Sequence, residues 1–197
     1  APQVRIADEP TASLDPERDV LLIMAGGMEA GDLKNVLSQL AEFRWSLSVV
    51  VICGRSADLL KVAHAEVNEH AGPVHFRVFG FVDDVPTYMA AADLLVTKPG
   101  GMTVSEALAA GLPLVLINPY PLQEEANANA LLENGVAVRV DPLSTFALKL
   151  RRLLEDAERL ADMRSAALRL ARPDAAMTVA RSVLDELVVG SQERGRN

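Results

Sequence analysis

The residues best suited to chemistry lie in residues 96–129, where glycines, a threonine and carboxylates follow apolar runs. Gly100 and Gly101 allow a backbone to approach a ligand closely, and the spacing predicts a helix that begins near Thr103. The start of a helix presents unpaired N–H groups and the positive end of the helix dipole, which suits a phosphate. Glu106 lies one turn inside that helix, where its carboxylate can accept hydrogen bonds from sugar hydroxyls. A phosphate site beside a carboxylate predicts a nucleotide-sugar pocket.

The elements that position these residues are predicted by apolar runs that alternate with amphipathic stretches. The expected strands are residues 20–25, 47–53, 74–79, 94–97, 114–117 and 136–140, and the expected helices are 33–43, 57–70, 85–92, 103–110 and 124–133. Continuous apolar strands between amphipathic helices are typical of a parallel sheet covered on both faces. The fold class is therefore α/β, with a doubly wound, Rossmann-like, six-stranded parallel sheet and right-handed crossovers.

The ends of the chain differ in character from this alternating region. Residues 1–18 are rich in proline and charge and are interpreted as a linker or N-terminal arm, and residues 19–189 as one nucleotide-sugar-binding domain. Residues 144–171 predict one or two helices, and residues 175–188 a last helix. Residues 190–197 are expected to be a disordered tail.

Four segments are expected at one edge of the sheet, because ligands of open parallel sheets bind at the carboxyl ends of strands. They are residues 26–31, 80–85, 98–106 and 119–127. In the second segment, Asp83 and Asp84 stand before a predicted helix, so N-capping is the favoured role rather than metal binding.

Composition excludes several classes of function. The formal net charge of −8 argues against nucleic acid as a partner and against a surface that docks on anionic lipids. No run of eighteen apolar residues occurs, so no membrane-spanning helix is expected. The one cysteine, Cys53, excludes an intrachain disulfide and indicates a reducing compartment. The expected location is cytoplasmic, peripheral to a membrane only through a further domain.

Three separated blocks resemble the donor-binding signature of glycolipid glycosyltransferases. This family includes the monogalactosyldiacylglycerol synthases, the processive diacylglycerol glucosyltransferases and the N-acetylglucosaminyltransferase that makes lipid II. The matching residues are Lys98, Gly100, Gly101, Thr103, Glu106 and Ala107, then Gly111 and Pro113, then Pro121, Gln123, Glu124 and Asn127. Their order and separation make the resemblance specific.

The resemblance implies one half of a GT-B fold that binds a UDP-sugar donor for an inverting transfer of a hexose to diacylglycerol or a related lipid. It implies neither cofactor nor metal, because the helix dipole can stabilise the leaving diphosphate. The implied contacts are Gly26, Gly27 and, less directly, Met28 with the diphosphate; Phe81 and the backbone of Val82 with uracil; Gly100, Gly101, Met102 and Thr103 with the phosphates; Glu106 with the ribose; and Gln123, Glu124 and Asn127 with the sugar.

Structural alternatives stand beside several of these roles. Phe81 suits core packing as well as base binding, and Lys98 suits a surface salt bridge as well as a phosphate contact. Glu106 also suits a structural role, in which its carboxylate near the helix start interacts with the helix dipole and binds no ligand. Asn127 also suits a role in bracing its loop, and residues 123–127 also fit a solvated helix start.

The resemblance further implies a partner. The family's general base lies in an N-terminal acceptor domain, and no glycine-rich motif of the kind that carries this base precedes Asp19. That domain, or a membrane-associated subunit, would bring the lipid acceptor, and the chain alone is predicted to bind donor with little transfer. A non-catalytic nucleotide-sugar module remains an alternative. A dinucleotide oxidoreductase is disfavoured, because no G-x-G-x-x-G follows the first strand.

Overall fold

The fold is a six-stranded parallel sheet with helices on both faces, in a computed structural model that describes residues 18–68, 72–118 and 123–194. The strands are β1 Asp19–Met24, β2 Leu47–Ile52, β3 Val74–Phe79, β4 Leu94–Thr97, β5 Leu114–Ile117 and β6 Ala137–Val140. They lie in the order β3-β2-β1-β4-β5-β6, and all five pairings are parallel. The predicted doubly wound sheet is confirmed, and its direction of winding reverses between β1 and β4.

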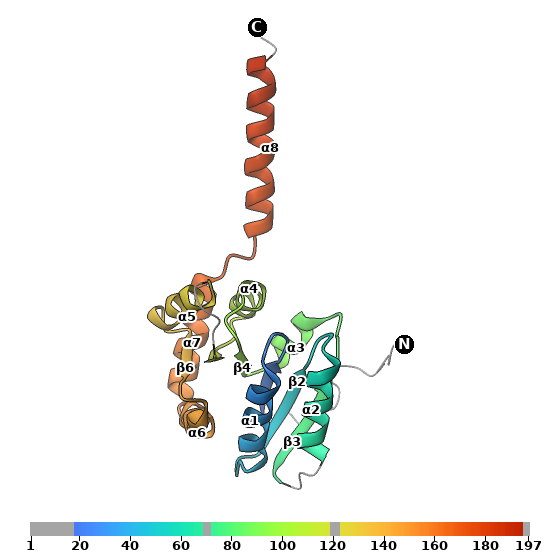
Figure 1. Ribbon diagram of the computed structural model, residues 1–197. Coiled ribbons are helices and arrows are strands. Elements are labelled where there is room, and N and C mark those ends of the chain that lie inside the picture. Colours follow the sequence, from blue (N-terminus) through green and yellow to red (C-terminus); the bar gives the residue numbers. More distant parts are fainter. Residues whose placement is uncertain (1–17, 69–71, 119–122, 195–197) are drawn as a thin grey trace.

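Two layers of helices cover this sheet (Figure 1). The helices are α1 Ala30–Ala41, α2 Ala57–Asn68, α3 Val85–Ala91, α4 Gly101–Ala109, α5 Gln123–Glu133, α6 Phe146–Leu154, α7 Ala157–Leu170 and α8 Ala175–Arg194, with a short 3-10 turn η1 at Leu143–Thr145. The core on one face is formed with α1, α2 and α6, and the core on the other face with α3, α4 and α5. Helix α7 contributes to both.

The burial of these elements follows their sequence patterns. All six residues of β2 are buried, as expected for a central strand covered on both faces. In α1 the buried residues are Leu33, Val36, Leu37 and Leu40, which is one stripe of a 3.6-residue period. Phe79 at the end of β3 packs edge-on against Tyr88 of α3, with ring centroids 5.5 Å apart. This contact fixes α3 beside the sheet edge.

Some boundaries differ from the prediction. Helix α4 begins at Gly101 rather than near Thr103, so three of the predicted phosphate-binding residues occupy its first turn. The 144–171 region forms two helices, and the side chain of Asp156 caps the second by accepting a hydrogen bond from the Arg159 amide at 2.9 Å. Helix α8 continues past Val188 to Arg194.

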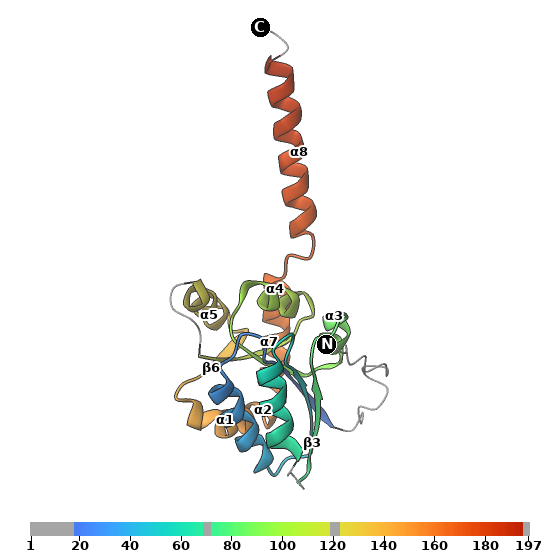
Figure 2. The same ribbon diagram turned by 45° about the vertical axis from the view of Figure 1, so that its right-hand side comes forward.

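Helix α8 projects away from the rest of the molecule in both views (Figures 1 and 2). Its side chains Met177, Val179, Val183 and Leu184 are more than half exposed. Within the described residues, none of the helices is both long enough and apolar enough to cross a bilayer.

Candidate functional site

The turn between β4 and α4 lies at the point where the winding of the sheet reverses. The amide of Gly100 donates to the Lys98 carbonyl at 2.8 Å, and the Thr97 hydroxyl donates to the same carbonyl at 3.0 Å. Gly100 is the N-cap of α4 and has no side chain to close the helix end. Gly101, Met102 and Thr103 follow as the first three helical residues, whose amides have no partner within a helix.

The glycines of this turn are not required by the backbone. Gly100 has φ −67° and ψ 139°, a conformation open to any residue. A Cβ added to Gly101 would have no described atom within 4 Å. Gly100 and Gly101 therefore place no side chain of their own over the N-terminal end of α4. Met102 is 77% exposed beside it, while Thr103 and Glu106 are half-buried.

Helix α5 holds two polar side chains against this turn. The Asn127 amide donates to the carbonyl of Pro99 at 2.9 Å, and a Cβ on Gly100 would lie 3.9 Å from Oε1 of Glu124. Asn127 thus braces the turn, as the alternative interpretation proposed, and Glu124 lies beside the helix end. Gln123 is exposed at the start of α5. Pro121 lies outside the described residues, as do the other residues of 119–122.

An ion pair anchors α5 to the sheet on its other side. Arg139 of β6 donates to the Glu125 carboxylate, and Lys149 donates to the Arg139 carbonyl at 2.7 Å. The hydrogen bond from Arg139 holds the pKa of Glu125 below its ordinary value of 4.5. The start of α5 is thus tied to β6 through Glu125 and to the turn before α4 through Asn127.

The turn after β1 is the second glycine turn at this edge. Gly26 and Gly27 are exposed, and Gly27 has φ +87°, which a residue with a side chain rarely adopts. Met28 is only 6% exposed and packs in the core with α1, so the expectation that it faces a diphosphate is wrong. The helix that follows has Glu29 as its N-cap and Asp32 in its first turn.

The loop after β3 carries the residues predicted to contact a base. Phe81 is 54% exposed, so the core-packing interpretation is wrong. Val82 is half-buried and packs against the core on the α4 face. Asp84 caps α3 by accepting from the Thr87 amide at 3.3 Å, which confirms the predicted N-cap, whereas Asp83 is exposed. Sequence reasoning missed Arg55, whose guanidinium carbon lies 4.4 Å from the Phe81 ring centroid.

Two other polar side chains at this edge are buried. Lys98 is 6% exposed, so it does not lie on the surface, as the salt-bridge alternative expected. Cys53 is fully buried at the end of β2, and burial raises the pKa of its thiol to about 11. Cys53 is therefore protonated at neutral pH and has no nucleophilic character.

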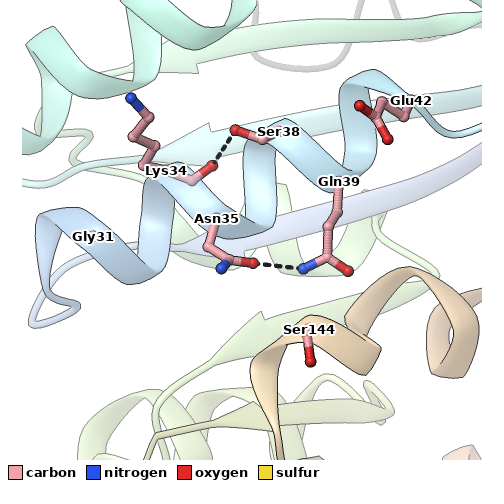
Figure 3. Close-up of a pocket in the computed structure, with 7 residues that line it drawn as sticks. All are labelled: Gly31, Lys34, Asn35, Ser38, Gln39, Glu42 and Ser144. Atoms are coloured by element: carbon pink, nitrogen blue, oxygen red, sulfur yellow. Dashed lines mark hydrogen bonds between the residues drawn. The ribbon is translucent and has the colours of Figure 1, made fainter.

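A hollow in the described part of the chain lies away from this edge of the sheet. It is an open polar groove of about 510 Å³ between α1 and η1, lined by Gly31, Lys34, Asn35, Ser38, Gln39, Glu42 and Ser144 (Figure 3). It contains none of the predicted site residues. Gln39 joins its two walls, since its amide donates to the Leu143 carbonyl at 3.0 Å and accepts from the Ala147 amide at 3.0 Å. We therefore interpret the groove as part of the packing contact between α1 and the η1–α6 segment, and not as a ligand site.

No group of three His, Cys, Asp or Glu side chains within the described ranges is arranged to hold a metal ion.

Comparison with known proteins identifies the family of this chain. Residues 17–169 match the family described as Glycosyl transferases group 1. The chain belongs to this glycosyltransferase family. Among its relatives, the processive diacylglycerol beta-glucosyltransferase of Bacillus licheniformis is 35% identical over 153 residues, which is 77% of this chain and 39% of that protein. The predicted kinship with glycolipid glycosyltransferases is confirmed.

Solved structures confirm the predicted fold of one half of a GT-B glycosyltransferase. Acinetobacter baumannii MurG aligns with a TM-score of 0.74 and 23% identity, over 87% of this chain and 51% of that one. Anabaena Alr3699/HepE in complex with UDP-glucose aligns with a TM-score of 0.65 and 21% identity, over 88% and 49%. The chain thus corresponds to about half of each structure and spans well under half of its curated glucosyltransferase relative.

Proposed function

We propose that this chain is the donor-binding half of an inverting glycosyltransferase and that it holds a UDP-sugar over the start of α4. One observation carries the proposal: Gly100 and Gly101 place no side chain over the start of α4, and the first turn of α4 carries no acidic residue. The amides of that turn and the helix dipole suit a diphosphate. A likeness to a structure that holds UDP-glucose supports the choice of donor.

The neighbouring carboxylates give the site its preference for a sugar nucleotide over a bare phosphate. Glu106 lies one turn inside α4 and accepts from the ribose hydroxyls, while Glu124 and Gln123 bind hydroxyls of the donor sugar. Gly26 and Gly27 face the diphosphate from the other side of the switch point. As the sugar leaves, the helix end stabilises the charge that develops on UDP, and the mechanism requires no metal or cofactor.

The acceptor side of the reaction is proposed to lie outside this chain. The named relative is more than twice as long as the matched region and is a diacylglycerol glucosyltransferase by name. We therefore propose a lipid acceptor such as diacylglycerol, brought with a general base by an acceptor domain or a membrane-associated subunit. The expected location is the cytoplasm, at the membrane surface through that partner.

Calorimetric titration tests the proposal directly. UDP, UDP-glucose, UDP-galactose and UDP-N-acetylglucosamine are titrated into the chain and into Glu106→Ala. Loss of two charged hydrogen bonds should weaken UDP about tenfold or more. Glu158→Ala, an exposed glutamate on α7, is the matched control and should bind as the unaltered chain does. Equal affinity of Glu106→Ala and the unaltered chain would contradict the ribose contact, and absence of UDP binding would overturn the function.

A turnover measurement separates the donor-binding half from a complete enzyme. The chain is incubated with UDP-glucose and diacylglycerol in detergent micelles, and release of UDP is followed. We expect donor binding with negligible transfer. Transfer at ordinary enzymatic rates would show that the general base lies within these 197 residues.

A further inference from the structure

The ion pair between Arg139 and Glu125 joins the last strand of the sheet to the start of α5. Val138 and Val140 of β6 pack in the core with α1 and α6, so the alternation of a strand directs Arg139 to the opposite face, which α5 covers. There its guanidinium donates to the Glu125 carboxylate, and both residues are half-buried. Among the described elements, β6 is the chief neighbour of α5. The pair therefore ties α5 to the strand that supports it.

The two polar contacts of α5 lie on opposite sides of Glu124. The buried residues of this helix are Ala128 and Leu131, and Glu124 lies one turn before Ala128 on the same face. Because each residue of a helix is turned by about 100°, Glu125 lies to one side of that face and Asn127 to the other.

Contacts at these flanking positions restrain rotation of α5 about its own axis. Asn127 donates to the turn before α4, and Arg139 holds Glu125 from β6. Loss of either contact allows the helix to turn and carries Glu124 with it. The position of Glu124 matters, because its Oε1 would lie only 3.9 Å from a Cβ on Gly100, the N-cap of α4.

We propose that Arg139 is a positioning residue that acts through Glu125 to orient Glu124, and that it thereby sets the affinity of the site for the sugar of the donor. This inference rests on the proposed function, in which Glu124 binds sugar hydroxyls and the start of α4 binds the diphosphate. The described hydrogen bonds of Arg139 join it to α5 and, through Lys149, to α6. Loss of Arg139 should therefore weaken the sugar contacts and spare the contacts that α4 makes with the nucleotide.

The test compares UDP with UDP-glucose by calorimetry, because the ratio of their dissociation constants isolates the contribution of the sugar. The unaltered chain is compared with Arg139→Gln, Arg139→Lys, Glu125→Gln and the double variant Arg139→Gln/Glu125→Gln. The double variant loses one positive and one negative charge, so its net charge equals that of the unaltered chain. Arg151→Gln, which removes an arginine from the exposed pair with Glu155 on α6, is the matched control. Circular dichroism melts give a temperature at which every variant is folded.

Arg139→Gln should weaken UDP-glucose about fivefold and UDP less than about twofold, since one charged hydrogen bond is lost at a distance from the nucleotide. Arg139→Lys should restore part of the affinity, because an ammonium group pairs with a carboxylate without the fork of a guanidinium. Glu125→Gln should have a smaller effect, because its amide oxygen still accepts from Arg139. The double variant should bind UDP-glucose as weakly as Arg139→Gln does. Arg151→Gln should leave both constants unchanged.

Two results would overturn the inference. Recovery of UDP-glucose affinity in the double variant would show that Arg139 acts through its charge and not through the position of α5. An equal loss for UDP and UDP-glucose in Arg139→Gln would show that the ion pair supports the whole site. The proposed function stands in both cases, because the unaltered chain still binds UDP. Absence of UDP binding to the unaltered chain would overturn the proposed function, and this inference with it.

Discussion

Two glycine turns flank the switch point of the sheet, and they differ in charge. The turn after β1 leads into α1, which has Glu29 as its N-cap and Asp32 in its first turn. The turn after β4 leads into α4, whose first turn carries no acidic residue. Carboxylates within the first turn of a helix already complement its dipole and repel an anion, whereas a first turn without them leaves its amides available to one. At α4 the nearby carboxylate, Glu124, comes from α5 and not from the helix itself.

The difference shows that glycine spacing alone does not define a phosphate site. Gly27 has φ +87°, so the backbone itself requires glycine there. Gly100 has a backbone conformation that any residue adopts, and a Cβ on Gly101 would meet no described atom within 4 Å. Neither position therefore needs glycine for the turn to form. We infer that the backbone itself requires glycine at position 27, whatever else Gly27 contacts, whereas only a ligand requires Gly100 and Gly101. Four sets of substitutions test the difference between the two turns.

The largest contrast is expected between Gly101→Val and Gly27→Ala. The valine side chain occupies the space over the helix end, so UDP affinity should fall about twentyfold, while stability stays within a few tenths of a kcal/mol. Gly27→Ala should lower the free energy of unfolding by about 1 kcal/mol or more, because alanine is strained at positive φ. Calorimetry and denaturant unfolding measure the two quantities. The opposite assignment of effects would refute the comparison.

The next effect is expected for Met102→Glu. Met102 is 77% exposed in the first turn of α4. A carboxylate at this position interacts favourably with the positive end of the helix dipole, and the substitution removes little packing. Stability should rise by about 0.3–1 kcal/mol, while UDP affinity should fall about tenfold through repulsion of the diphosphate.

Met102→Gln is the neutral control for that experiment and should change both quantities much less. The loss of affinity in Met102→Glu should shrink at high salt, since exposed charges are screened. A glutamate that stabilises the helix without weakening UDP would place the diphosphate elsewhere.

A smaller effect is expected for Asn127→Ala. The substitution removes the hydrogen bond from α5 to the Pro99 carbonyl, so the glycine turn loses its brace. Stability should fall by about 1 kcal/mol, and UDP affinity by about threefold. Asn129→Ala, at an exposed position of the same helix, should leave both unchanged. An affinity loss far above threefold would indicate that Asn127 contacts the sugar itself.

The smallest effect concerns the second anchor of α5. Folding lowers the pKa of Glu125 through the hydrogen bond from Arg139, so the ionised carboxylate stabilises the native state. That stability is present above the ordinary glutamate value of 4.5 and is lost as pH falls through the lowered pKa. Arg139→Gln should therefore have a lower Tm than the unaltered chain at pH 7, and the gap should narrow toward pH 3.5.

The control for this pH dependence is Arg151→Gln. Arg151 pairs with Glu155 at 3.7 Å on the exposed side of α6, where ion pairs contribute little. A gap between Arg139→Gln and the unaltered chain that does not vary with pH would show that the arginine acts through packing alone.

The sheet and its helices could be predicted because each strand is a continuous apolar run between amphipathic segments. β3, β4 and β5 have the predicted bounds, since their runs end at polar residues, glycine or proline. The start of α4 was misplaced by two residues, because Gly101 is a poor helix former whose helical state is set by the turn before it.

Contacts between loops could not be predicted from spacing. The Arg55–Phe81 pair depends on how two neighbouring strands end. A bracing role for Asn127 could be predicted, but its partner, the carbonyl of Pro99, lies 28 residues away in the sequence. The exposure of Phe81 and the burial of Lys98 both oppose the usual preference of their residue types. Such exceptions are frequent at functional sites, where local rules yield to the needs of a ligand.

The pairing of β1 with β4 has a consequence for synthesis of this protein. β1 can join β2 and β3 as soon as these have left the ribosome, but its other edge gains a partner only when β4 emerges, as the pairing of Leu21 with Leu94 shows. At about 5–20 residues per second, that edge stays open for several seconds. This seam lies at the start of α4, so a nucleotide bound there requires that β4 has already joined β1.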